Sequence, residues 1–364
     1  MTTPERPLDR SASSLGAAGG RNTQERPLDR SASSLGAAGG RGTTRIRWGI
    51  LATGRIANTF AEDLALLPDA EIAAVGSRTL DAARGFATRH GIPRAYGSWD
   101  ELAADPDIDV VYVANPHSAH HAATRLMLSS GKAVLCEKPI TLDLASTQDL
   151  VTVARENGVF LMEAMWMRTI PAIRKIAGLV ADGALGEVTA VYADFGVAGP
   201  FAPEHRMRDP ALGGGALLDL GIYPVTFAHL FLGPAQRTTA LATLTPEGVD
   251  ENTAIVLGYD NGALASLHCG IVGASPNIAS IVGETGRIEL PAPFFRPDRF
   301  TIHRGEHAEV VQVPIRGNGM GYEAEEVMRC LREGLTESPL VPLSATLDVM
   351  RCLDAVRAQI GVTY

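Results

Sequence analysis

The chain has 364 residues, 46% apolar and 20% charged, a globular composition with room for two domains of ordinary size. A formal net charge of −9 argues against a nucleic acid or an anionic membrane as partner, so any phosphate site must be local. The four cysteines are scattered without a C-x-x-C pair, and no uninterrupted apolar run reaches the ~18 residues of a membrane span. We therefore expect a cytoplasmic protein with neither a disulfide framework nor a metal site.

The first 44 residues contain one segment twice, because ERPLDRSASSLGAAGGR occurs at 5–21 and again at 25–41. Two copies rich in Ser, Gly, Ala and Arg cannot bury a hydrophobic core. The sequence predicts a disordered tail over residues 1–44. An arm that wraps around another subunit is the alternative.

Short apolar runs then alternate with helical patterns. Strands are predicted over 46–51, 71–75, 109–114, 133–136 and 159–163, and helices over 55–67, 79–90, 118–130 and 142–156. A capping-box pattern, Ser98-x-x-Glu101, marks a further short helix. This alternation predicts an α/β fold, with a doubly wound parallel Rossmann sheet over residues 45–165.

The alternation stops after Glu163. The later patterns predict helices near 171–181, 216–231, 322–334 and 344–360, and strands over 187–195, 253–259, 263–271, 278–290 and 300–313. Asn261-Gly262 marks a hairpin turn. Consecutive strands followed by helices predict a second, α+β domain over 166–364 with a largely antiparallel open sheet.

The first strand-to-helix turn, GILATGRIA at 49–57, resembles a dinucleotide-binding fingerprint with Ala52 in place of the first glycine. Gly54 allows a pyrophosphate to approach the backbone, and the helix start offers free N–H groups. An ordinary strand-to-helix turn is the alternative. The predicted cofactor contacts in this turn are Ala52, Thr53, Gly54, Arg55 and Ile56.

The end of the second strand distinguishes between the two nicotinamide cofactors. NAD sites commonly place Asp or Glu there to bind the ribose, but this chain has Ser77-Arg78-Thr79. Ser77 can hydrogen-bond a phosphate, and Arg78 can pair with it or stack on adenine. The pattern favours NADP, with NAD still possible; a solvated loop arginine is the alternative.

Two further motifs follow strands at the sheet edge where ligands bind in open α/β folds. The residues predicted to border the cofactor there are Asn115, Pro116, His120, Glu137 and Lys138. Lys138 could hold the nicotinamide ribose and lower the pKa of a neighbouring hydroxyl. A structural histidine at position 120 and a surface lysine at 138 are the alternatives, while Pro139 is a candidate for a cis bond.

A glycine-rich run leads from Gly213 to Asp219 and Tyr223. The last two are four residues apart, so a helix would place them on one face, although Pro224 opposes helical geometry at Tyr223. A tyrosine with a pKa of ~10 needs a nearby cation to exchange protons near neutrality, and Lys138 would serve. A core tyrosine beside a capping aspartate is the alternative.

These motifs resemble the Gfo/Idh/MocA oxidoreductase family, on the residues Asn115-Pro-x-x-x-His120, Glu137-Lys138-Pro139 and Asp219-x-Gly-x-Tyr223. The stretches MEAMWMR (162–168), GRIELPAPFF (286–295) and GYEAEE (321–326) resemble its branch of dimeric dihydrodiol dehydrogenases and NADP-dependent xylose dehydrogenases. The resemblance covers about residues 45–364. The duplicated segment has no counterpart in it.

The resemblance implies roles for individual residues. Lys138 and Tyr223 would be the catalytic acid–base pair, and Asp219 would bind and place the substrate. Trp166, Arg168 and Phe195 would form pocket walls, and Arg206 would contact substrate or cofactor. The family's open sheet commonly forms a subunit interface, which implies a homodimer or a higher homo-oligomer.

The leading hypothesis is an NADP-dependent oxidoreductase that transfers hydride between nicotinamide and a CH–OH group of a small polyol, such as an aldose, a sugar derivative or a trans-dihydrodiol. One alternative is a non-catalytic module that senses NADP(H) or a sugar. Another is an enzyme like glucose–fructose oxidoreductase, in which a tightly held cofactor cycles between two sugars.

Overall fold

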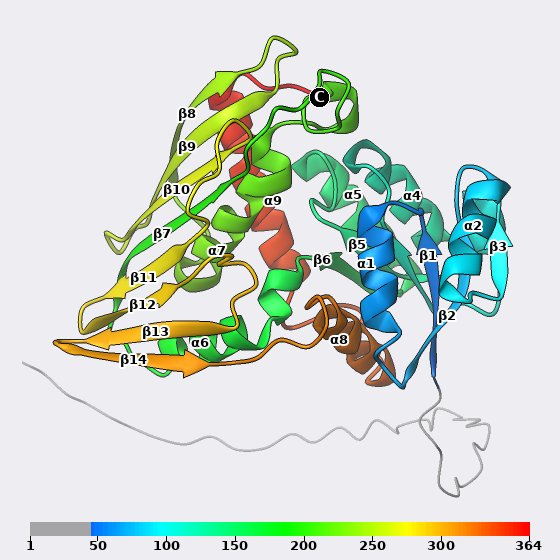
Figure 1. The fold of residues 1–364 in the computed structure, drawn as a ribbon, viewed down its shortest axis with the longest axis horizontal. Coiled ribbons are helices and arrows are strands. Elements are labelled where there is room, and N and C mark those ends of the chain that lie inside the picture. The colour runs from blue at the N-terminus through cyan, green and yellow to red at the C-terminus, as the bar shows by residue number, and fades with distance from the viewer. Residues whose placement is uncertain (1–44) are drawn as a thin grey trace, which may run out of the picture. The chain divides into compact units, whose positions relative to one another are not determined.

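Two β-sheets organise residues 45–364, the part of the chain that the computed structural model describes (Figure 1). The predicted tail over 1–44 lies outside the described residues. The elements of the first half are β1 (Ile46–Leu51), α1 (Arg55–Leu64), β2 (Ala70–Gly76), α2 (Leu80–His90), β3 (Arg94–Tyr96), α3 (Trp99–Ala104), β4 (Val110–Val113), α4 (His117–Ser129), β5 (Ala133–Glu137), α5 (Leu144–Asn157) and β6 (Leu161–Ala164).

The first sheet is parallel throughout, with the strand order β3-β2-β1-β4-β5-β6. Its central strand β4 is wholly buried, as an apolar run between two helical layers requires. Strands β2 and β3 follow on one side of β1, and β4 to β6 follow on the other side. Ligands bind at such a switch point, beyond the carboxyl ends of the strands. This confirms the predicted Rossmann sheet.

Local sequence signals set the helix ends. Ser98 caps α3, because its hydroxyl accepts a hydrogen bond from the Glu101 N–H at 3.2 Å, as the capping box predicts. Gly91 ends α2 with a positive φ of 66°. The first helix ends at Leu64, earlier than predicted, and Pro68 has no N–H to donate to the Leu64 carbonyl in a further turn.

The second half begins with the 3₁₀ turn η1 and contains eight strands. Its elements are η1 (Trp166–Thr169), α6 (Pro171–Ala181), β7 (Val188–Gly196), η2 (Pro210–Leu212), η3 (Leu217–Gly221), α7 (Ile222–Leu232), β8 (Arg237–Leu244), β9 (Asp250–Gly258), β10 (Leu264–Gly270), β11 (Ala279–Gly283), β12 (Gly286–Leu290), β13 (Arg299–Arg304), β14 (His307–Gln312), α8 (Gly321–Arg332) and α9 (Leu343–Ile360).

The second sheet has the order β14-β13-β12-β11-β7-β10-β9-β8, in which only β7 and β10 pair in parallel. The prediction of a largely antiparallel sheet is confirmed. The apolar stretches 278–290 and 300–313 are each a hairpin, because short polar turns interrupt them. The turn at Asn261-Gly262 has three loop residues, with Tyr259 bonded to Ala263 and Gly262 at a φ of 86°.

Helices α7 and α9 fill the space between the sheets. Helix α7 packs on β7, while α9 contacts β8 on one side and α5 and β6 on the other (Figure 1, α9 in red). The stretch Pro210–Leu232 is long and apolar enough to cross a membrane, but 78% of its 18-residue window is buried in the protein. This is the composition of a core helix that packs on both sides.

Candidate active site

A cavity of about 610 Å³ opens beyond the carboxyl ends of the parallel strands, against η3 and α7. All the predicted site residues except Arg168 line it. Strands β1, β2, β4 and β5 end at this edge, so the turns that follow them meet there although they lie far apart in sequence. Five lining residues were not predicted: Ala114, His117, Leu212, Leu220 and Phe295.

Arg168 lies outside the cavity, and its predicted place in the pocket wall is corrected. Its Nε donates to the carbonyl oxygen of Leu340 at 2.8 Å, and its side chain is half-buried away from the cavity. Trp166 and Arg168 are two residues apart in the 3₁₀ turn η1, so their side chains leave on different faces. Trp166 takes the cavity side.

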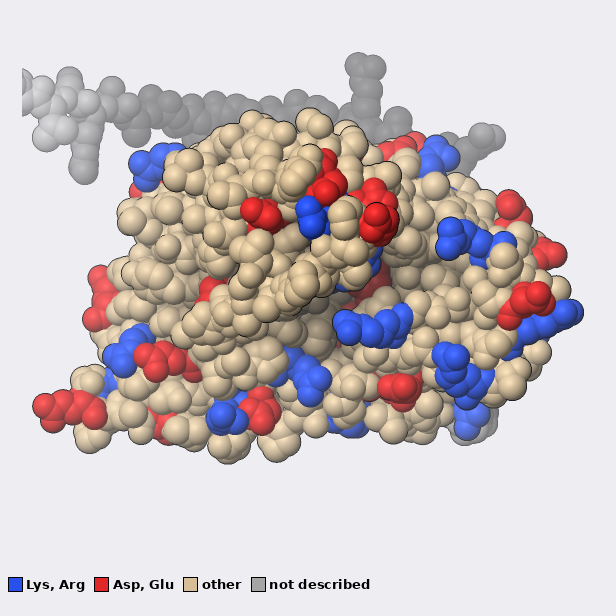
Figure 2. All heavy atoms as spheres, turned by 45° about the horizontal axis from the view of Figure 1, so that its top comes forward, with Lys and Arg blue, Asp and Glu red and all other residues tan. Residues whose placement is uncertain are grey.

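The turn from β1 into α1 suits a dinucleotide pyrophosphate. Helix α1 has no side-chain cap at Gly54, which leaves its first N–H groups available to a ligand. A Cβ built on Gly54 meets no atom within 4 Å, so open space lies beside the backbone. Within residues 45–364, neither Arg55 nor Arg78 has a carboxylate partner, and Figure 2 shows a hollow with Lys or Arg side chains (blue) at its margin.

Ala52 has a backbone conformation that favours glycine, with a φ of 110°. Such strain costs on the order of 1–3 kcal/mol in a non-glycine residue, offset in part by the stiffer unfolded chain. We expect Ala52→Gly to raise the free energy of unfolding by about 1 kcal/mol and to leave NADPH affinity roughly intact. Urea unfolding and calorimetric titration measure both; a large gain in affinity would show that Ala52 handicaps the cofactor site.

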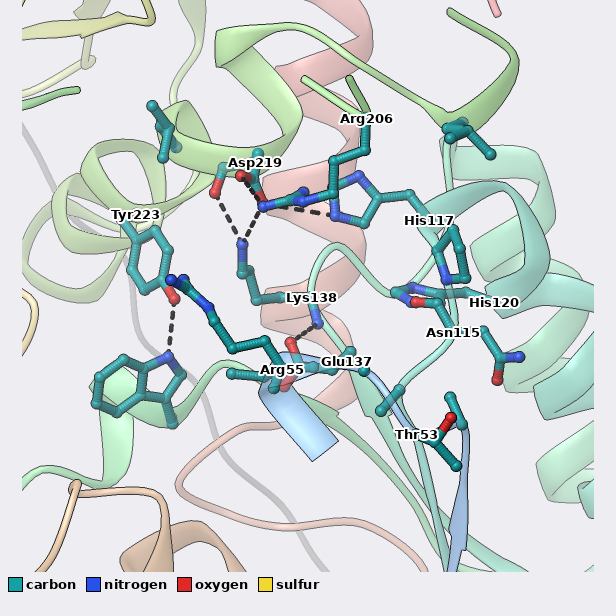
Figure 3. Close-up of a pocket in the computed structure, with 18 of the residues that line it drawn as sticks. Thr53, Arg55, Asn115, His117, His120, Glu137, Lys138, Arg206, Asp219 and Tyr223 are labelled. Carbon is teal, nitrogen blue, oxygen red and sulfur yellow. Dashed lines mark hydrogen bonds and ion pairs between the residues drawn. The ribbon is translucent and has the colours of Figure 1, made fainter. Parts of the chain in front are cut away.

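Lys138 and Asp219 form the polar centre of the cavity (Figure 3). The Lys138 ammonium donates to the Asp219 carboxylate at 2.9 Å and to the backbone carbonyl of Asp219 at 2.8 Å. Arg206 pairs with the other carboxylate oxygen at 2.9 Å. Burial opposes the charge on Asp219, but Lys138, His117 and Arg206 outweigh it and hold the pKa of this carboxyl well below its usual range.

The backbone contact to Lys138 depends on an irregular turn. Residues Leu217–Gly221 form a π-helical turn, in which carbonyls bond to N–H groups five residues ahead. Five residues after Asp219 stands Pro224, which has no N–H, so the Asp219 carbonyl is free to accept from Lys138. Tyr223 therefore lies in the first turn of α7, although Pro224 follows it. The proline is accompanied by a π-helical hydrogen-bond register in the preceding residues, Leu217–Gly221.

Tyr223 is 5% exposed, and its hydroxyl oxygen accepts a hydrogen bond from the indole N–H of Trp166 at 2.7 Å. The Lys138 ammonium lies 5.1 Å from the centre of the phenol ring. Burial raises the pKa of Tyr223 to about 12, although Lys138 and Trp166 act in the opposite direction. Lys138 thus acts on this pKa in the expected direction, but burial outweighs it, and the net pKa lies above the ordinary value.

The two histidines of the turn after β4 are both buried. Nε2 of His117 lies 3.6 Å from the Asp219 carboxylate, and burial lowers the pKa of His117 to about 3. Both ring nitrogens of His120 face backbone carbonyls, those of Asn115 and Pro139. His120 borders the cavity but has no ring nitrogen left for a cofactor, so the structural alternative describes it better.

Aromatic side chains form the wall opposite the ion pair. Phe195 and Phe295 are stacked with their ring centres 4.6 Å apart, and Phe295 also contacts Trp166 and Tyr223 at 5.8 and 5.0 Å. Phe295 belongs to the GRIELPAPFF stretch, and His117 lies inside the motif at 115–120. The sequence motifs therefore include both residues, although neither is predicted as a site residue.

Comparison with known proteins agrees with this geometry. A model of the oxidoreductase family with an NAD-binding Rossmann fold matches residues 46–165, and a model of the GFO/IDH/MocA C-terminal domain matches 173–289. The chain belongs to the Gfo/Idh/MocA oxidoreductase family. It is accordingly an NAD(P)-dependent oxidoreductase.

Similar proteins span nearly the whole described chain. Trans-1,2-dihydrobenzene-1,2-diol dehydrogenase of Macaca fascicularis is 40% identical over 330 residues, and that of Homo sapiens is 39% identical over 330; each comparison covers 88% of this chain and 98% of the relative. The 3-ketoreductase KijD10 of Actinomadura kijaniata, solved with NADP and TDP-benzene, has a TM-score of 0.79 at 30% identity, covering 87% and 98%. An aldose-aldose oxidoreductase of Caulobacter crescentus shares the fold, with a TM-score of 0.79 at 24% identity.

Proposed function

We propose that this family member transfers hydride between the nicotinamide of NADP and a CH–OH carbon of a small cyclic polyol, a sugar or a trans-dihydrodiol. The observation that carries the proposal is the juxtaposition of Tyr223 with the Lys138–Asp219 pair on the wall of a cavity bordered by the nucleotide turn. The dihydrodiol dehydrogenases named above, at about 40% identity, support this substrate class.

Tyr223 handles the proton in this proposal. The Trp166 N–H occupies one acceptor position of the hydroxyl oxygen, so the phenolic proton is directed elsewhere, toward a substrate oxygen in the cavity. During reduction of a ketone, Tyr223 donates this proton to the substrate oxygen; during oxidation, its oxygen takes the proton back. Lys138 stabilises the phenolate that forms. When bound, the nicotinamide supplies or accepts the hydride.

The cavity wall favours a ring-shaped substrate with one apolar face. Trp166, Phe195 and Phe295 offer aromatic surface, while Asp219 and Arg206 offer a carboxylate and a guanidinium to hydroxyl groups. An apolar surface with a few fixed polar groups orients such a ligand. Initial rates with NADP⁺ and, separately, NAD⁺, on trans-1,2-dihydrobenzene-1,2-diol, D-xylose and other aldoses test the proposal.

The outcomes of this screen separate the proposal from its alternatives. Nucleotide binding without turnover of any polyol would favour a sensing module. Nucleotide that stays with the protein through gel filtration, with turnover only when a second sugar is present, would favour a cofactor that cycles between two sugars. Steady NADPH formation from one diol supports the proposed dehydrogenase.

We expect Arg78→Ala to weaken NADPH binding by roughly 10-fold or more and NADH binding much less, because a lost charge-assisted contact to a phosphate costs on this order. Ser77 and Arg78 line the cavity after β2, where the ribose of the adenosine would lie. Fluorescence titration with both nucleotides measures the ratio. Equal weakening of the two would contradict the assignment of Arg78 to the extra phosphate of NADP.

We also propose a homodimer formed through the open face of the eight-stranded sheet. Tyr192, Leu241, Val256 and Leu264 share this face by strand register, and all are about half exposed or more, Leu241 reaching 79%. An apolar patch of this kind marks an interface. Sedimentation velocity should show a dimer that Leu241→Lys weakens about 10-fold or more. The matched control is Leu66→Lys, at an exposed leucine that is not part of the eight-stranded sheet. A monomeric wild type would contradict the proposal.

A further inference from the structure

The peptide group between Pro139 and Ile140, directly after Lys138, is held at both of its polar atoms by buried side chains. Its carbonyl oxygen lies 2.7 Å from Nδ1 of His120. Its N–H donates to Oε1 of Glu163 at 3.2 Å. His120 is 0% and Glu163 3% exposed, so water does not compete for either bond.

Each of the two side chains has a second polar neighbour. Nε2 of His120 faces the carbonyl oxygen of Asn115 at 2.8 Å, in the turn that precedes α4. The second carboxylate oxygen of Glu163 accepts from the Thr346 hydroxyl of α9 at 2.9 Å. The peptide after Pro139 is therefore tied through Glu163 to the core helix α9, while the His120 ring that meets its carbonyl oxygen lies against the turn at Asn115.

Neither side chain reaches the reacting groups directly. In the part of the chain that the structure describes, His120 and Glu163 make no hydrogen bond to Lys138, Asp219 or Tyr223. A peptide that donates and accepts in a low-dielectric surrounding is polarised, so each of its hydrogen bonds strengthens the other. Their shared target is the Pro139–Ile140 peptide, one residue beyond Lys138, whose side chain extends toward Asp219 (Figure 3).

We propose that His120 and Glu163 are a pair of positioning residues that clamp the Pro139–Ile140 peptide and thereby aim Lys138 at Asp219 and Tyr223. The inference rests on the proposed function, in which Lys138 acts beside Tyr223. Burial lowers the pKa of His120, an effect that the two carbonyls oppose, and a neutral ring has a single N–H. In the clamp this N–H is on Nδ1 and is donated to Pro139.

Two variants of His120 distinguish the roles of its two ring nitrogens. In His120→Asn the amide nitrogen can occupy the place of Nδ1, and in His120→Gln it can occupy the place of Nε2. We expect His120→Asn to keep kcat near wild type and His120→Gln to lower it roughly 10- to 100-fold, the scale on which small displacements of catalytic groups act. The dissociation constant of NADPH should stay within about twofold in both, because the ring does not hold the cofactor. Equal kcat values for the two variants would overturn the role of Nδ1.

Glu163 is tested by Glu163→Gln, which keeps an oxygen acceptor for Ile140, and by Glu163→Met, which removes it. Thr346→Val is the matched control, since it removes the other hydrogen bond of the same carboxylate and leaves Ile140 bonded. Glu163→Met should lower kcat by roughly the same factor as His120→Gln, with little change in KM. Glu163→Gln and Thr346→Val should retain kcat. Loss of kcat in Thr346→Val equal to that in Glu163→Met would overturn the proposal.

Hydrogen exchange at the Ile140 amide gives a readout that needs no substrate. We expect Glu163→Met to accelerate this exchange by about 10-fold or more relative to Thr346→Val. The two variants are compared under conditions in which their free energies of unfolding are equal. If wild type turns over no polyol, the proposed function fails while this exchange still tests the clamp. Unchanged exchange in Glu163→Met overturns the clamp whatever the activity.

The double variant His120→Gln/Glu163→Met tests whether the pair acts as one unit. Both substitutions release the same peptide, so the fall in kcat should be clearly smaller than the product of the two single effects. A fall equal to that product would mean that the two residues act independently, which would overturn the joint role.

Discussion

Tyr223→Phe is expected to lower turnover by roughly 100-fold or more, the scale of general acid–base catalysis, and to leave NADPH binding intact. The substitution removes the phenolic hydroxyl and keeps the ring that packs on Phe295 at 5.0 Å. Single-turnover rates and NADPH titration measure the two quantities. Unchanged turnover would eliminate Tyr223 as the proton donor and with it the proposed mechanism.

Trp166→Phe is the matched control for this result. It keeps the phenol but removes the N–H that the Tyr223 oxygen accepts at 2.7 Å. Because that hydrogen bond favours the phenolate, its loss should raise the pKa of Tyr223 further above its value of about 12. A neutral Tyr223 is the proton donor for reduction, so ketone reduction should change little across neutral pH. Alcohol oxidation, which needs a proton acceptor, should rise with pH and require higher pH in Trp166→Phe.

The sequence alone predicts that the residues of the site meet at one edge of the parallel sheet. Strand periodicity predicts that the turn at Ala52, the residues after Gly76 and the turn at Lys138 lie together, because parallel strands end at one edge. The four-residue separation of Asp219 and Tyr223 likewise predicts a shared face. These inferences depend on local periodicity alone, and the structure agrees with them.

The finer geometry depends on contacts that periodicity does not contain. The free carbonyl of Asp219 requires a π turn whose register is set by Pro224, and a proline there suggests at first a helix end instead. The burial that raises the pKa of Tyr223 involves Phe195 and Phe295, which are distant from it in sequence. Arg168 does not share the cavity with Trp166 because a 3₁₀ turn places side chains two residues apart on different faces, whereas an extended strand would place them on the same face.

Lys138→Met should lower turnover by about 100-fold or more, because it removes the charge that stabilises a phenolate on Tyr223. Methionine keeps most of the volume of the side chain, which is 12% exposed. Breaking a buried ion pair usually costs about 3–5 kcal/mol of stability, but Arg206 stays paired with Asp219, so we expect the lower part of that range or less. Turnover and urea unfolding, measured on the same preparation, separate the two effects.

The pair Lys138→Arg and Arg206→Met distinguishes a position-specific role from a general need for positive charge. A guanidinium at 138 keeps the charge but cannot easily donate to both the carboxylate and the backbone carbonyl of Asp219 at 2.9 and 2.8 Å, because its donors are fixed in a plane. We expect Lys138→Arg to remain strongly impaired. Arg206 is half exposed, and its ion pair is with Asp219, so Arg206→Met should raise KM more than it lowers kcat. If instead Lys138→Arg were fully active, charge alone would suffice, and the contact with the freed carbonyl of Asp219 would have no part in aiming the lysine.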